Sequence, residues 1–158
     1  LIIAVVAIGG YLLIKGPGGL NEAAVLSIQD GKITGEYALK DIIAIDESFK
    51  CDFLKEDEDS KVEGIISIAP GSKVRGDFSI SSSANPEPFE THFIMRGGFI
   101  YTWTSLLDVG VIASAAPGSS VNTGVTTLDE EIFYTCERFI PTPGLFEVPA
   151  DITFTNAK

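Results

Sequence analysis

The chain has 158 residues, of which 45% are hydrophobic and 21% are charged. A chain of this length buries roughly two-thirds of its unfolded surface, so the length predicts one domain with a single core. The 22 acidic and 11 basic residues give a formal net charge of −11 at pH 7. This charge disfavours nucleic acid as a partner and disfavours flat binding to anionic lipid, because both are negatively charged.

The sequence opens with an uncharged apolar segment, residues 1–14, which reads LIIAVVAIGGYLLI. As an α-helix it would be about 21 Å long, short of the roughly 30 Å hydrocarbon core of a bilayer. Its β-branched residues and the Gly9-Gly10 pair also permit a strand that adds to the sheet of an adjacent subunit. Both forms stay open, with the helix preferred.

Exposed apolar segments of this kind aggregate, so we expect burial in lipid, in the chain's own domain or against neighbouring copies. The first residue is Leu and not Met, and no basic region precedes the segment. We therefore expect a processed leader or a longer anchor, and both imply export. The expected assembly or anchor residues are Leu1, Ile2, Ile3, Val5, Val6, Ile8, Tyr11, Leu12, Leu13 and Ile14.

The sequence divides into three parts: a hydrophobic anchor or assembly segment (1–15), a glycine-rich linker (16–19) and a β-rich globular domain (20–158). Within the domain, Asp30-Gly31 predicts a tight turn, and the spacing of Leu39, Ile42, Ile43 and Ile45 predicts a short helix over 38–45. The fold class is mainly β, with an antiparallel sheet and one short helix.

From residue 49 onward, short β-rich runs alternate with Gly, Pro, Asn or acidic clusters, a pattern typical of an antiparallel meander. In one run Val74, Phe78 and Ile80 share a face, and the residues between them point to solvent. The last run is expected to be an edge or closing strand. The predicted strands are 49–54, 62–69, 73–80, 89–96, 99–104, 109–113, 131–139 and 152–155.

The two cysteines, Cys51 and Cys136, each lie in a predicted strand, and neither belongs to a Cys-x-x-Cys motif. A usual zinc site needs more Cys or His ligands than the two cysteines and the sole histidine, His92, provide, so no metal is expected. We predict a Cys51–Cys136 disulfide, which would persist only in an oxidising compartment. The expected location is therefore extracytoplasmic, at the cell surface or beyond it.

Other candidate sites favour structural interpretations. His92 has no nucleophile motif near it, and the run Glu56-Asp57-Glu58-Asp59 lacks the glycine and spacing of a calcium loop. The tripeptide Arg75-Gly76-Asp77 lies inside a predicted strand. We expect no catalytic residue, no cofactor and no enzyme activity. The aromatic side chains are expected in the core: Phe93, Phe99, Tyr101, Trp103, Phe133, Tyr134 and Phe139.

Two resemblances bear on function. The apolar start, the Phe49-Lys50-Cys51 run, the His92-Phe93-Ile94 run and the residues after Cys136 resemble small uncharacterised surface proteins of candidate-phyla bacteria. This resemblance implies surface location and disulfide pairing. More loosely, the apolar N-terminus resembles pilins, although Val5 stands where type IV pilins carry Glu and the segment stops at Ile14.

Together these features predict a non-enzymatic subunit of a surface filament, forming a homo-oligomer through the N-terminal segment. The alternative is a membrane-anchored binding domain for an apolar ligand, in which the same segment contacts the membrane.

Overall fold

The computed structural model describes residues 26–84, 86–115 and 126–157. They form one sheet of nine strands in the order β1-β8-β2-β3-β4-β5-β6-β7-β9, with one short helix. The strands are β1 (Lys32–Ala38), β2 (Phe49–Glu56), β3 (Ser60–Ala69), β4 (Lys73–Ser82), β5 (Phe89–Arg96), β6 (Phe99–Thr104), β7 (Val109–Ser114), β8 (Glu131–Arg138) and β9 (Thr153–Asn156). The helix, α1 (Leu39–Ile43), follows β1.

The predicted meander is confirmed, because each strand from β2 to β6 pairs antiparallel with the strand that follows it in the chain. Turn residues explain the tight reversals. Gly97 and Gly98 both have positive φ, 58° and 79°, between β5 and β6, which is the backbone that a two-residue hairpin requires. The predicted Asp30-Gly31 turn is also present, with φ of 50° and 76°.

Three features of the fold were not predicted. β1 occupies one edge and pairs with β8. At the other edge β9 runs parallel to β7, so the sheet is mixed and not wholly antiparallel. The helix is shorter than expected, because Ala38 ends β1, Ala44 is the C-cap of α1, and Asp46 has a positive φ of 58°.

The two faces of the sheet differ in composition: we call the apolar, buried face on the side of α1 the inner face, and the opposite face the outer face. The inner face carries alternate residues such as Phe49, Cys51 and Phe53 of β2, which are at most 6% exposed. Leu39 and Ile42 of α1 are fully buried in the same cluster. Burial of this apolar surface, worth about 25 cal/mol per Å², is the main force holding α1 to the sheet.

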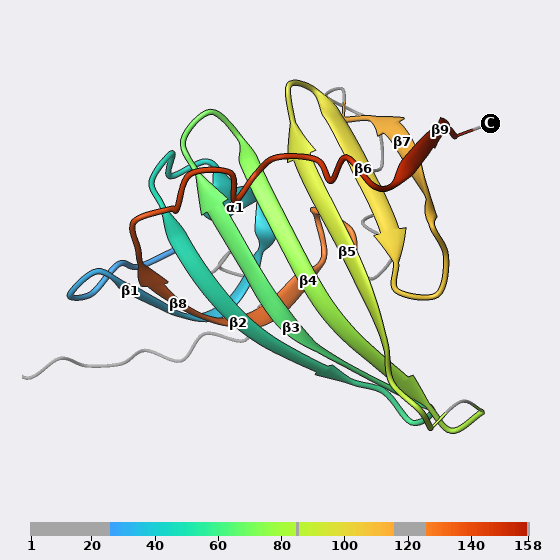
Figure 1. The fold of residues 1–158 in the computed structure, drawn as a ribbon. Coiled ribbons are helices and arrows are strands. Elements are labelled where there is room, and N and C mark those ends of the chain that lie inside the picture. The colour runs from blue at the N-terminus through green and yellow to red at the C-terminus, as the bar shows by residue number, and fades with distance from the viewer. Residues whose placement is uncertain (1–25, 85, 116–125, 158) are drawn as a thin grey trace, which may run out of the picture.

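A long segment after β8 crosses the sheet. β8 lies beside β1 at one edge and β9 lies at the other, so residues 139–152 must travel from one side to the other. We call these residues the strap. Figure 1 shows the strap passing over the strands close to the β3–β4 and β5–β6 turns, on the side opposite α1. The structure thus has three layers, namely the strap, the sheet and α1.

Candidate functional site

The predicted disulfide is confirmed. Cys51 and Cys136 lie directly opposite each other on β2 and β8, with Cα atoms 3.9 Å apart and both side chains fully buried. β8 is the strand that joins β1 to the rest of the sheet. The bond therefore fixes the β1–β8 pair covalently to the meander. A disulfide is compatible with an oxidising location.

The N-terminal assembly residues predicted from sequence, Leu1 to Ile14, lie outside the described residues. Within residues 26–84, 86–115 and 126–157 there is no helix long and apolar enough to cross a membrane.

The outer face of the sheet carries a polar cluster around Asp77. Arg75 donates two hydrogen bonds to its carboxylate, from Nε at 2.8 Å and from Nη2 at 3.0 Å. Nδ1 of His92 lies 2.8 Å from Oδ1 of Asp77, and since an ionised carboxylate only accepts, Nδ1 is the donor. Burial opposes ionisation of Asp77, but the hydrogen bonds from Arg75 and His92 prevail and hold its pKa below the ordinary value.

Aromatic rings enclose the same cluster. The His92 ring stacks on Trp103 with centroids 5.2 Å apart, and Phe154 of β9 meets Trp103 edge-on at 5.9 Å. Nε2 of His92 faces Glu90 at 3.7 Å. An Asp–His pair orients the base in hydrolases, but such a site also needs a nucleophile at the free ring nitrogen. Among the described residues, His92 makes no hydrogen bond to a Ser, Thr or Cys side chain.

Trp103 and the core residues Phe93 and Tyr134 are buried as expected, but two aromatic predictions were wrong. Phe99 and Phe133 are about half exposed, at 47% and 51%. Each lies on the outer face, where no layer of the described chain covers it fully. Sequence alternation correctly grouped Phe99 with Trp103 but could not tell which face the core occupies.

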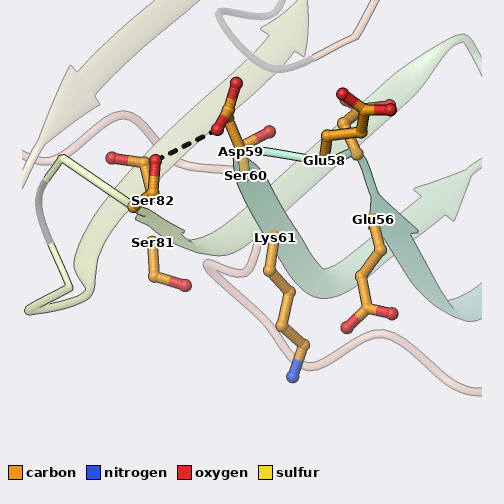
Figure 2. Close-up of a pocket in the computed structure, with 9 residues that line it drawn as sticks. Glu56, Glu58, Asp59, Ser60, Lys61, Ser81 and Ser82 are labelled. Carbon is orange, nitrogen blue, oxygen red and sulfur yellow. Dashed lines mark hydrogen bonds between the residues drawn. The ribbon is translucent and has the colours of Figure 1, made fainter.

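A second cluster lies at the β2–β3 turn, where Glu56, Asp57, Glu58 and Asp59 form what we call the acidic tip. Figure 2 shows Glu56 and Lys61 extending to the opposite side of the ribbon from Glu58 and Asp59. Ser83 donates to Asp59 through its hydroxyl at 3.2 Å and its amide at 2.9 Å. The described residues include no group of acidic, His or Cys side chains placed to hold a metal ion.

A third site lies under the strap. A groove of about 450 Å³ separates strap residues 141–147 from the ends of β3, β4 and β5. Pro141, Leu145 and Phe146 give it an apolar wall, and Lys73 and Arg96 give it two cations. Arg96 donates to the carbonyl of Phe146 at 3.1 Å, and Arg75 donates to that of Leu145 at 3.4 Å. We call this space the strap groove.

The sequence offered no signal for the strap groove, because its two walls are about fifty residues or more apart in the chain. The Asp77–His92 pair was foreseeable in principle. Both residues are at outward positions of adjacent predicted strands, and the β4–β5 register places them opposite each other.

Comparisons of the chain with protein-family models, with curated proteins and with solved structures find no match.

Proposed function

We propose that this chain is a non-enzymatic, pilin-like subunit of an extracellular filament, assembled through residues 1–14. The same proposal includes membership in the group that the sequence resembles, the small surface proteins of candidate-phyla bacteria. The observation that carries the proposal is the position of the disulfide relative to β1, the first strand of the described residues.

The described chain begins at residue 26 and soon enters β1, the strand at one edge of the sheet. A subunit held by its N-terminal segment would receive tension at this strand. β1 pairs with β8 alone among the described strands, and β8 is bonded covalently to β2 through Cys51–Cys136. Tension at the N-terminus would therefore pass from β1 through β8 to β2 and the meander without peeling β8 away.

The polar cluster on the outer face also favours a structural role. Asp77 accepts hydrogen bonds from Arg75 and His92, and the His92 ring is stacked on Trp103. These contacts hold β4, β5 and β6 together across the outer face. They give His92 a structural function that needs no substrate.

Electron microscopy of the full chain tests the proposal. We expect helical fibres with residues 1–14 in their core. Val5→Asp with Leu12→Asp should abolish the fibres while the β domain keeps its fold and disulfide. Leu106→Asp is the matched control, because Leu106 is an apolar residue of the domain that is 66% exposed, and this variant should still form fibres. Dispersed wild-type particles in detergent would reject the proposal.

A second candidate function is binding of an apolar ligand by a membrane-anchored domain. It is favoured by a hollow of about 300 Å³ whose apolar lining is Ile43, Met95, Ala115 and Leu128, a volume at the lower limit of ligand pockets. Native mass spectrometry of the gently extracted protein distinguishes the two. A co-purifying lipid of defined mass would support the binding function, and protein mass alone would count against it.

A further inference from the structure

The strap groove contains most of the unpaired positive charge in the described chain. Nine of the basic residues are described. Lys32, Lys40, Lys55, Lys61, Arg75 and Arg138 are in ion pairs. Lys50, Lys73 and Arg96 remain, and of these Lys73 and Arg96 both line the strap groove.

The groove is held open by its own hydrogen bonds. The amides of Leu145 and Glu147 bond to the carbonyls of Thr142 and Gly144, at 3.2 Å and 2.9 Å, so the strap turns twice above the sheet. Arg96 anchors the strap through the carbonyl of Phe146, and a carbonyl leaves the guanidinium charge unneutralised. Glu147 is the one carboxylate in the lining, so the two cations leave an excess of positive charge.

The opposite charge gathers at the other end of the sheet. The acidic tip starts at Glu56, the last residue of β2, and ends just before β3. No cation of the described residues forms an ion pair with its four carboxylates. β3 has ten residues, which at about 3.3 Å each separate its ends by roughly 30 Å. Figure 1 shows the β2–β3 turn at the far end of the molecule from the strap crossing.

We infer that the acidic tip of one copy docks in the strap groove of the next copy. The contact joins two different surfaces, and head-to-tail contacts of this kind produce open filaments when the rotation between copies does not close a ring. The inference rests on the proposed function, since it names the contact between β domains in the same filament. The contact area is small, so its affinity depends on the N-terminal segment joining the same two copies.

Zero-length carbodiimide coupling of the full chain tests this contact, because it joins an amine directly to a carboxylate. A mixture of ¹⁴N- and ¹⁵N-labelled protein is coupled at low salt, and the products are mapped by mass spectrometry. We expect mixed-isotope peptides joining Lys73 to the acidic tip. The separation along β3 prevents this product within one chain. High salt should reduce its yield, because exposed charges are screened within about 10 Å at 0.1 M ionic strength.

Charge-swap variants provide a second readout, namely fibre length by electron microscopy. Lys73→Glu and Glu58→Lys should each shorten the fibres several-fold, and the two changes together should restore most of the length. Lys50→Glu is the matched control, because Lys50 is the unpaired cation of the described chain outside the groove. It should leave fibre length unchanged.

The outcomes separate this contact from the proposed function. Fibres whose Lys73 couples only to Glu147 of its own chain, or to nothing, would overturn the contact and leave the filament. Mixed Lys73–tip products from protein that forms no fibres would establish the contact and reject the filament. Citrate serves as a probe for a free anion. If micromolar citrate protects Lys73 from acetylation and Lys73 does not couple to the acidic tip, the groove binds a free anion and the contact is overturned.

Discussion

Gly76 and Phe93 lie opposite each other on β4 and β5, and the ring of Phe93 occupies the space that a side chain at position 76 would need. A Cβ on residue 76 would lie 2.2 Å from Phe93 Cε1 and 2.5 Å from Phe78 Cζ. The glycine of the Arg75-Gly76-Asp77 tripeptide therefore has a packing role, because it lets two aromatic rings meet over the strand.

Gly76→Ala should lower the free energy of unfolding by about 1–3 kcal/mol, since overpacking forces both rings from their positions. Urea denaturation followed by the fluorescence of Trp103, the single tryptophan, measures this. Gly71→Ala is the control, because a Cβ there meets no atom within 4 Å, although its φ of 77° adds some strain. An equal or larger loss at Gly71 would contradict the packing explanation.

Removing the disulfide with Cys51→Ala and Cys136→Ala should cost about 2–5 kcal/mol, because the unfolded chain regains the freedom of a long loop. The same denaturation assay applies, and reduced wild-type protein should match the double variant. A difference under about 1 kcal/mol would show that the β1–β8 pair holds to β2 without covalent help.

Tyr134→Phe should stabilise the protein by about 1 kcal/mol, because the hydroxyl is buried without a hydrogen-bond partner in the described structure. Burial, followed by the negative charge of Glu130, raises the pKa of this hydroxyl, so it stays protonated and neutral. Thermal unfolding of the two proteins measures the effect. Destabilisation by the same amount would reveal a partner such as a buried water molecule.

Asp77→Asn should cost about 0.5–1 kcal/mol at pH 7, since Asp77 is partly exposed and its ion pair with Arg75 is screened by solvent. The folded-state pKa of Asp77 lies below its unfolded value. Its contribution is therefore complete above the unfolded pKa of about 3.9 and is lost as the pH falls through the folded pKa.

The pH dependence of stability checks this sign. Below about pH 4 the wild-type protein should lose the stability that ionised Asp77 contributes. The Asp77→Asn variant lacks this contribution at every pH. Asp52→Asn is the control, because Asp52 is also at an outer-face position and forms no ion pair among the described residues. The Asp52→Asn variant should retain the wild-type dependence of stability on pH. If its pH dependence is weakened as much as that of Asp77→Asn, the assignment to Asp77 is rejected.

Local sequence signals predicted the meander well. Strands β5 and β6 have the predicted bounds, 89–96 and 99–104, because Gly97-Gly98 and the loop before Phe89 mark their ends. The Cys51–Cys136 pairing was also predictable, since both residues are at inward positions of strands. The strand bounds depend on a few adjacent residues, whereas the disulfide joins two positions that are 85 residues apart.

The remaining features depend on distant parts of the chain. β1 contains Gly35 and few apolar residues, so its own sequence gives little indication of a strand. Its strand conformation depends on pairing with β8, about a hundred residues later in the chain. The strap groove arises where the chain crosses the sheet, and the parallel β7–β9 pairing follows from the same crossing. Alternation of polar and apolar side chains predicts which residues share a face of the sheet. It does not predict the order of the strands in space.

The pairing of β1 with β8 also sets an order of events during synthesis. Strands β2 to β7 follow one another, so each finds its partner soon after it is made, as low-separation contacts do. β1 is made first, yet its partner ends only at Arg138. A chain interrupted before Glu131 therefore keeps β1 and Cys51 without β8, and the junction through which β1 joins the sheet can form only after β8 has been made.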